Sequence, residues 1–167
     1  DSAGRVYVVD PGNARVQVFD NDGRFLRAWG TYGDGEGQFF LPRAIAVARD
    51  GRVYVTDIAS ARRVQVFDAK GKYLSMWNTG GDGQMLLPFG IAVDSAGRVY
   101  VTDFETNRVQ VFDGDGRFLT GWGTKGKEGG QFDGPSAIAV HWTGLVYVTD
   151  WGNSRVQVFA PVPRYPR

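Results

Sequence analysis

The chain has 167 residues and a formal net charge of +1, so it is long enough for one compact domain and gives no electrostatic reason to expect nucleic acid or an anionic membrane as partner. It contains no cysteine and one histidine, which excludes disulfides, thiolate metal sites and a three-histidine zinc site. No apolar run approaches the roughly 18 residues that span a bilayer. The 24 glycines and 14% aromatic residues, together with alternating valines, indicate an all-β protein with many tight turns.

One segment occurs four times along the chain and defines a repeat. In its last copy, from Val146 to Phe159, it reads VYVTDWGNSRVQVF. Each copy contains one aspartate, and successive aspartates are 47, 46 and 47 residues apart. A period of this size predicts stacked supersecondary units. The aspartates are Asp10, Asp57, Asp103 and Asp150.

Each repeat predicts four short strands in a fixed order. The first covers residues 44–47, 90–93 and 137–140, the second is the VYV run, and the third is the RVQVF run. The chain begins with a second strand and ends with a third, which gives 14 predicted strands. Both alternating positions are apolar in places, so we expect strands that are buried on both faces. The fourth strands are Phe25–Trp29, Tyr73–Trp77 and Phe118–Trp122.

Glycines and prolines predict the connections between these strands. Gly23, Gly71 and Gly116 supply the positive φ of tight hairpins between third and fourth strands. Residues 113–116 (DGDG) and 33–38 (GDGEGQ) lack the remaining ligands of a calcium loop or a phosphate loop, so we interpret them as a hairpin and a crossover link. Long links, each with one proline, join successive repeats. The prolines are Pro42, Pro88 and Pro135.

Over residues 1–160 the motifs follow one order, which is VYVTD, RVQVFD, a glycine hairpin, FL..WG, a Gly-Gln-Phe stretch and P..IAV. This order resembles the NHL repeat family. The resemblance implies a β-propeller, usually with six blades. WD40 and YWTD propellers are weaker matches, because the Gly-His and Trp-Asp signatures are absent and the YWTD pattern lacks the RVQVFD and P..IAV pieces.

We therefore expect an all-β chain, a β-propeller of four-stranded antiparallel blades with about 3.5–4 blades present. Blade material is assigned to residues 1–30, 31–77, 78–122 and 123–160, followed by a C-terminal tail at 161–167. One interpretation is that these are the C-terminal two-thirds of a six-bladed ring, with on the order of 90 residues upstream. The other is a complete chain that closes by self-association into a homo-oligomer with about eight blades, or into a strained four-bladed ring.

An aspartate and an arginine bracket each loop between second and third strands. A hairpin brings the two side chains together, and the carboxylate can also accept N–H bonds from the turn. Since the pair is used four times, we interpret it as architecture and not as catalytic machinery. The pairs are Asp10 with Arg15, Asp57 with Arg63, Asp103 with Arg108, and Asp150 with Arg155.

Positions that differ between repeats are the candidates for binding. Aromatic residues and arginines on an exposed face are typical binding anchors. The links and the loops between second and third strands should share one face of a propeller, and we predict a ligand-binding face there. Its residues are Arg43, Ile58, Arg62, Phe89, Phe104, Ser136 and Trp151.

These features predict a non-catalytic scaffold that binds a protein, a peptide or a small ligand, with no cofactor, no metal and no catalytic residue. His141 is expected at the surface, and loops of mixed charge argue against nucleic acid. One alternative is that the chain is part of a propeller enzyme of the lyase or esterase type, whose metal ligands would lie upstream. Another is a chain made to study propeller assembly. The family resemblance also suggests a bacterial extracytoplasmic sensor or interaction module.

Overall fold

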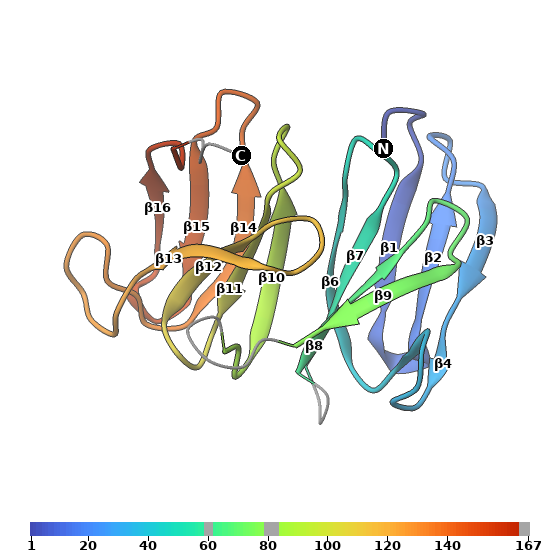
Figure 1. Cartoon of the computed structure of the whole chain (residues 1–167), viewed down its shortest axis with the longest axis horizontal. Helices are drawn as coiled ribbons and strands as arrows, with labels where there is room; N and C mark the ends of the chain where they lie inside the picture. The colour runs from blue at the N-terminus through green and yellow to red at the C-terminus, as the bar shows by residue number, and fades with distance from the viewer. Residues whose placement is uncertain (59–61, 79–83, 164–167) are drawn as a thin grey trace.

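A computed structural model describes residues 1–58, 62–78 and 84–163. The described chain forms antiparallel sheets that follow one another in an arc, and the N-terminus lies on one edge of it (Figure 1). The predicted all-β propeller architecture is confirmed. Two sheets have four strands, and the first and last have three, in strand order along the chain. We number these sheets as blades 1 to 4.

The strand bounds are as follows. Blade 1 contains β1 (Val6–Asp10), β2 (Arg15–Phe19) and β3 (Phe25–Trp29). Blade 2 contains β6 (Pro42–Val47), β7 (Val53–Asp57), β8 (Arg63–Phe67) and β9 (Tyr73–Trp77). Blade 3 contains β10 (Pro88–Val93), β11 (Val99–Asp103), β12 (Arg108–Phe112) and β13 (Phe118–Trp122). Blade 4 contains β14 (Pro135–Val140), β15 (Val146–Asp150) and β16 (Arg155–Phe159).

The fourth strands occupy the predicted residues, but the first strands begin earlier than predicted. Each starts at the link proline, and the pairing register shifts just after it. A proline has no N–H to give to the ladder, so it is accepted at the first residue of a strand, and the bulge that follows restores the pairing. The prolines therefore belong to the blades. They are Pro42, Pro88 and Pro135.

The connecting segments contain short regular pieces that the sequence did not indicate. The first link contains a parallel pair, β4 (Thr31–Tyr32) with β5 (Gln38–Phe39). The loops after β1 and β15 each form one 3₁₀ turn, η1 (Pro11–Asn13) and η3 (Trp151–Asn153). A left-handed residue ends each turn and turns the chain into the third strand.

The blades pack face to face, and we call the side toward the preceding blade the front face and the side toward the next blade the back face. Tyr54 and Val64 on the back of blade 2 pack with Val99, Val101 and Phe112 on the front of blade 3. The same arrangement joins blade 1 to blade 2 and blade 3 to blade 4.

A tryptophan at the end of each fourth strand contacts a phenylalanine of the next blade. The ring centres are 5.7 Å apart for Trp29 and Phe67, and 4.8 Å apart for Trp77 and Phe112. Trp122 lies 5.4 Å from a phenylalanine of blade 4 in the same way. These contacts extend each interface to the outer edge of the blades.

Burial on both faces is confirmed for the second and third strands of blades 2 and 3. In β7, β8 and β11 every residue is buried. The expectation is wrong for the end blades, because β1 and β16 alternate between more and less exposed residues. Among the residues that the structure describes, blades 1 and 4 have a neighbouring blade on one face only, so the valines of their other face are exposed.

Candidate functional site

The described residues of the links and of the loops between second and third strands lie on the edge opposite the N-terminus (Figure 1). We call this edge the loop face; it comprises residues 30–43, 84–89 and 123–136, which include the starts of β6, β10 and β14, and the described residues of the loops that follow β1, β7, β11 and β15. A backbone bond ties each link to the loop beside it. Phe104 donates its N–H to Leu87 O at 3.0 Å, and Trp151 donates to Gly134 O at 3.2 Å. Residues that directly follow the repeated aspartates are thereby fixed beside the links.

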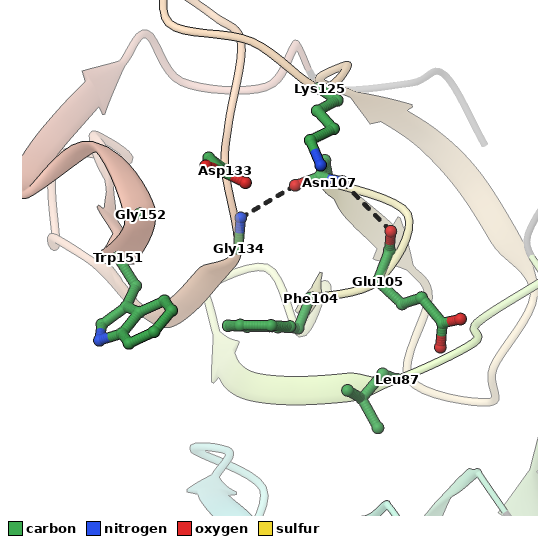
Figure 2. Close-up of a pocket in the computed structure, with 9 residues that line it drawn as sticks. All are labelled: Leu87, Phe104, Glu105, Asn107, Lys125, Asp133, Gly134, Trp151 and Gly152. Carbon is green, nitrogen blue, oxygen red and sulfur yellow. Dashed lines mark hydrogen bonds between the residues drawn. The ribbon is translucent and has the colours of Figure 1, made fainter.

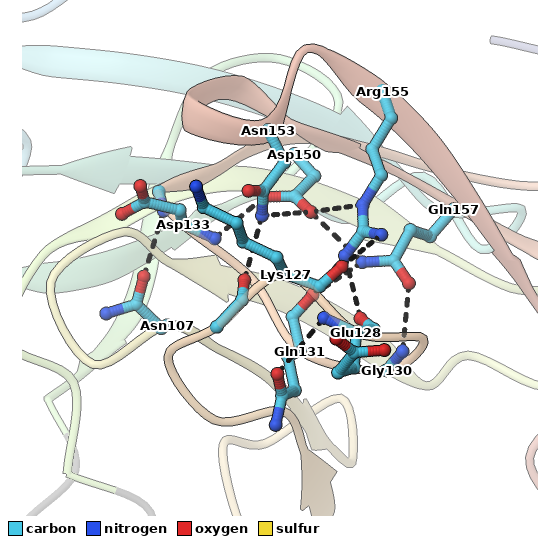
Figure 3. Close-up of polar contacts among 12 residues, drawn as sticks. Asn107, Lys127, Glu128, Gly130, Gln131, Asp133, Asp150, Asn153, Arg155 and Gln157 are labelled. Carbon is cyan, nitrogen blue, oxygen red and sulfur yellow. Dashed lines mark hydrogen bonds and ion pairs between the residues drawn. The ribbon is translucent and has the colours of Figure 1, made fainter.

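The repeated aspartate holds the link that enters its own blade, as Figure 3 shows for blade 4. Asp150 Oδ1 accepts the backbone N–H of Asp133 at 2.8 Å, and Oδ2 accepts from Arg155 Nε at 2.8 Å. Arg155 in turn donates to the carbonyls of Lys127, Glu128 and Gln131. The link is therefore held at its N–H groups by the carboxylate and at its carbonyl groups by the guanidinium.

Blade 2 repeats this arrangement in a more buried form. Asp57 accepts the N–H groups of Phe40 and Leu41 at 3.3 and 2.8 Å. Arg63 Nη2 lies 3.4 Å from Asp57 Oδ2 and donates to Gln38 O at 2.8 Å. Both side chains are almost fully buried.

The structure corrects the expected pairing of Asp103 with Arg108. The two residues face each other across β11 and β12, but no ion pair joins them among the residues described. Backbone N–H groups occupy the carboxylate instead, since Leu86 and Leu87 donate to it from the link and two residues of the following turn donate as well. The third aspartate fastens the link without its arginine.

In blade 1 the pair forms as well, and the partners of Asp10 among the described residues are side chains. Asp10 Oδ2 accepts from Arg15 Nε at 2.8 Å, and Asn13 and Gln17 donate to the same carboxylate. Both partners of this ion pair are partly exposed.

The carboxylates of Asp150 and Asp10 are suited to remaining ionised. Burial raises the pKa of Asp150, but the N–H of Asp133 and the side chains of Asn153 and Arg155 outweigh it, so this pKa lies below the ordinary 3.8. Hydrogen bonds from Arg15 and Asn13 lower the pKa of Asp10. Groups with these properties are permanent electrostatic anchors at neutral pH and not proton carriers.

Four of the predicted binding residues form a continuous row across blades 2, 3 and 4, which we call the aromatic row. The guanidinium carbon of Arg43 lies 4.2 Å from the centre of the Phe89 ring. Phe89 and Phe104 have ring centres 5.1 Å apart, and Phe104 and Trp151 have ring centres 6.1 Å apart. Arg43 is exposed, the two phenylalanines are half-buried, and Trp151 is 72% exposed.

A pocket of about 380 Å³ lies at the blade 4 end of this row (Figure 2). Asn107 forms one wall and accepts the N–H of Gly134 at 2.9 Å, while its own amide donates to Glu105 O. Gly134 has φ +71°, and a Cβ there would lie 2.7 Å from the Phe104 ring, so only glycine permits this close approach. The lining residues are Leu87, Phe104, Glu105, Asn107, Lys125, Asp133, Gly134, Trp151 and Gly152.

The other three predicted residues lie outside the row. Ser136 Oγ is 2.8 Å from Thr149 Oγ1, and its carbonyl accepts from Thr102 Oγ1 at 2.7 Å, so it joins blade 3 to blade 4. Ile58 is half-buried and is tied through its N–H to the link. Arg62 is exposed and has φ +42°, while residues 59–61 of its loop lie outside the described residues.

The sequence interpretation missed the pocket residues on the link side. Asp133 and Gly134 precede the link proline, whereas the residue predicted from this link, Ser136, follows it. The sequence does contain a signal for Asn107, namely an asparagine at the end of its loop. Its φ is +58° there, a conformation in which asparagine is favoured over most side chains.

Sites of other kinds are not indicated in the part of the chain that the structure describes. No three His, Cys, Asp or Glu side chains are grouped there so as to hold a metal ion. His141 is exposed on the edge opposite the loop face, where its Nδ1 lies 2.7 Å from Thr143 Oγ1. Within the described ranges, no helix has the length and apolar character needed to cross a bilayer.

Solved structures with similar folds are propellers of other sequence. A streptogramin B lyase structure superposes with a TM-score of 0.68 at 16% identity, over 98% of this chain and 53% of that one. The WD40 repeats of RRP9 give a TM-score of 0.64 at 14% identity, over 93% of this chain and 47% of that one. At these identities the likeness concerns the fold alone, and the chain spans about half the length of these structures.

Sequence comparison finds NHL-repeat proteins that match part of the chain. The chain is 45% identical over 56 residues to human NHL repeat-containing protein 3, which covers 33% of this chain and 15% of that protein. It is 45% identical over 56 residues to the RING finger protein nhl-1 of Caenorhabditis elegans, covering 34% of this chain and 6% of that protein. The NHL repeat model matches residues 86–112 and 132–159, which run from link to third strand in blades 3 and 4. These matches confirm the NHL-repeat resemblance for the segments of blades 3 and 4 that they cover.

Proposed function

We propose that the chain is a non-catalytic binding module that takes a peptide segment of a partner protein on its loop face. The observation that carries this proposal is the aromatic row, which brings Arg43, Phe89, Phe104 and Trp151 together from three blades. Aromatic residues and arginine that gather on an exposed surface are typical anchors of protein recognition.

The row is supported from behind, which favours recognition with little loss of conformational freedom. The backbone beside Phe104 is held by Leu87 O, and the backbone beside Trp151 is held by Gly134 O. The links themselves are fastened by Asp103 and Asp150. A surface that is already ordered before binding loses less entropy when a partner docks.

The pocket at the end of the row suits an apolar or aromatic side chain within a polar peptide. Its lining includes the apolar side chains of Leu87, Phe104 and Trp151. Glu105 and Asp133 also line the pocket and oppose the positive charge of Lys125, which makes the pocket unfavourable for a phosphate group. A peptide backbone, with donors and acceptors of no net charge, fits this mixed lining better than a nucleic acid does.

The pocket also supports a binding role over a catalytic one. Its lining residues include no serine, cysteine or histidine, so they offer no nucleophile paired with a base. The likeness to a streptogramin B lyase concerns the fold and brings no catalytic residue to this chain. Stoichiometric zinc or calcium in the purified chain would favour the enzyme interpretation instead.

A selection of random peptides displayed on phage tests the proposal directly. Peptides would be selected on the immobilised chain and depleted on the Trp151→Ala variant. We expect a consensus with an aromatic or apolar anchor. Synthetic peptides of that consensus, measured by fluorescence polarisation, should bind Trp151→Ala about tenfold or more weakly, as for the loss of a central aromatic anchor.

Trp142→Ala is the matched control, because Trp142 is 79% exposed and lies in the hairpin between β14 and β15, on the opposite edge. The control should bind the selected peptides as the unchanged chain does. Equal binding to both variants would place the peptide elsewhere, and tight one-to-one binding of single-stranded RNA would contradict a peptide-binding role.

A further inference from the structure

Three arginines in the described part of the chain place the guanidinium over an aromatic ring. Arg43 lies over Phe89, with 4.2 Å between the guanidinium carbon and the ring centre. The other two, Arg52 and Arg98, lie over tyrosines at 5.8 and 5.9 Å. A guanidinium can contact a ring with its planar face and still bind a carboxylate through the N–H groups at its edge.

Two of these arginines bind such a carboxylate within the chain. Arg52 Nε donates to Asp50 Oδ2 at 2.7 Å, and Arg98 Nε donates to Asp94 Oδ2 at 2.6 Å. Arg43 differs, because it is exposed and no hydrogen bond or ion pair joins its guanidinium to another described residue. Its N–H groups are therefore available to a ligand at one end of the aromatic row.

The two ends of the aromatic row differ in charge. Arg43 stands at the blade 2 end, whereas two acidic residues and one lysine line the pocket at the blade 4 end. An acidic group of a ligand is attracted at the first end and is opposed by Glu105 and Asp133 at the second. The row therefore favours a peptide that places an apolar anchor in the pocket and an acidic residue beside Arg43.

The spacing of the rings matches an extended peptide. Phe89 and Phe104 have ring centres 5.1 Å apart, and Phe104 and Trp151 have ring centres 6.1 Å apart. An extended chain advances about 3.3 Å per residue with side chains on alternating sides, so residues two apart lie on one side at about 6.6 Å. Alternate side chains thus meet successive rings, and about three or four residues reach from the pocket to Arg43.

We propose that Arg43 binds the side-chain carboxylate of a glutamate or aspartate in the partner peptide, three or four residues from the apolar residue that enters the pocket. This inference rests on the proposed peptide-binding function of the loop face. It adds the charge that the partner carries and the spacing by which the chain selects it. Arg43 is then the residue that determines specificity.

The peptide consensus from the phage selection gives the first test. An acidic residue three or four positions from the apolar anchor is expected, and a consensus without one would overturn the proposal. The synthetic peptides carry an amide at the C-terminus, so that any carboxylate contact comes from a side chain. Glutamine or asparagine in place of the acidic residue should weaken binding about threefold to tenfold in fluorescence polarisation, as for an exposed ion pair of good geometry.

The position of the acidic residue gives a second test. Moving it to one or six residues from the anchor should weaken binding as much as its replacement by the amide does. Equal affinity at every position would show a general attraction and would overturn the assigned contact. Peptides that bind tightly only with a free C-terminal carboxylate, whatever their internal residues, would overturn it as well.

Arg43→Gln then shows whether this arginine receives the carboxylate. The variant should bind the acidic peptide about threefold to tenfold more weakly than the unchanged chain does. It should also bind the acidic peptide and its amide version equally, because the group that distinguishes them is gone. An equal loss for both peptides would overturn the proposal, since Arg43 would then act through its contact with Phe89 alone.

Arg49→Gln is the matched control, because Arg49 is exposed and lies in the hairpin between β6 and β7, at the far end of the strand that contains Arg43. It removes the same charge and should bind both peptides as the unchanged chain does. Far-ultraviolet circular dichroism with thermal melting establishes that each variant is folded before its affinity is interpreted.

Failure of this inference differs from failure of the proposed function. If Trp151→Ala weakens binding but the acidic residue and Arg43 have no effect, the loop face binds peptides and only the carboxylate contact is wrong. If Trp151→Ala has no effect on any peptide, the loop face is not the binding surface and both proposals are overturned.

Discussion

Arg43 places its guanidinium carbon 4.2 Å from the centre of the Phe89 ring, and this contact joins blade 2 to blade 3 on the loop face. Because Arg43 is exposed, the cation–π contact contributes about 0.5–1 kcal/mol to stability. Its larger effect is on orientation, since it holds one end of the aromatic row against the next blade.

We predict that Arg43→Leu lowers the free energy of unfolding by no more than about 1 kcal/mol but weakens binding of peptides selected on the loop face. Arg43→Lys should keep most of the stability and part of the binding, because lysine retains the charge and loses the planar stacking. Urea unfolding followed by tryptophan fluorescence, with fluorescence polarisation of the same samples, separates the two effects. Unchanged affinity in Arg43→Leu would remove Arg43 from the binding surface.

Asp57 and Asp10 occupy the same repeat position but differ in what they hold. Asp57 is fully buried, accepts two N–H groups of the link and faces a buried arginine, Arg63. Asp57→Asn should cost about 3 kcal/mol, because it leaves the Arg63 charge uncompensated. Asp10→Asn should cost much less, since its ion pair is partly exposed. Equal losses in chemical denaturation would refute the role of Asp57 in holding the link.

Acid should destabilise the fold through Asp150. Its folded pKa lies below the ordinary value of 3.8, so its contribution is complete above about pH 3.8 and is lost as the pH falls through the folded pKa. The melting temperature should therefore fall below this pH, and Asp150→Asn should show a shallower fall from a lower starting stability. Parallel curves for both proteins would exclude Asp150 as a source of the acid sensitivity.

At high pH, Tyr54 should act in the opposite direction. Burial raises the pKa of Tyr54 from 10.0 to about 12, and its hydroxyl donates to Gly114 O at 3.1 Å. The unfolded chain then loses the proton first, so the stability that this group contributes is complete below pH 10 and declines as the pH rises toward 12. Tyr54→Phe should reduce the decline only in part, because burial raises the pKa of Tyr100 as well. Thermal melts above pH 9, compared between the two proteins, provide the measurement.

Gly116 and Gly23 separate the effect of backbone strain from that of packing. Both have positive φ, but a Cβ at Gly116 would lie 2.3 Å from the Trp77 ring, whereas a Cβ at Gly23 would meet nothing within 4 Å. Gly23→Ala should cost about 1 kcal/mol from its left-handed backbone alone, and Gly116→Ala should cost about 1–3 kcal/mol more from overpacking. Equal costs would show that Trp77 can move aside without loss.

The sequence predicted most of the fold because every element appears several times, and a period that repeats in register leaves few alternatives. Strand order, the hairpin glycines and the NHL resemblance all follow from comparing copies. A comparison of copies does not show which residues of different repeats contact each other. The aromatic row is an example: Phe89 and Phe104 were named from variation alone, and only the packing of blades 2, 3 and 4 shows that they adjoin.

The failures have a similar cause. Repetition suggested that Asp103 pairs with Arg108 as its counterparts do, but the turn after β11 brings two further N–H groups to the carboxylate. Repetition also suggested uniform burial, whereas the end blades lack a neighbour on one side. Ser136 was placed among binding residues because its position varies, whereas its hydroxyl contacts Thr149 within blade 4 and its carbonyl accepts from Thr102 of blade 3.

The fastening of each link by the blade that it enters has a consequence for how the chain opens. Asp57 and Arg63 of blade 2 hold residues that arrive from blade 1, so blade 2 cannot lose its loops without releasing its predecessor. Each cooperative unit of opening therefore spans the boundary between two blades.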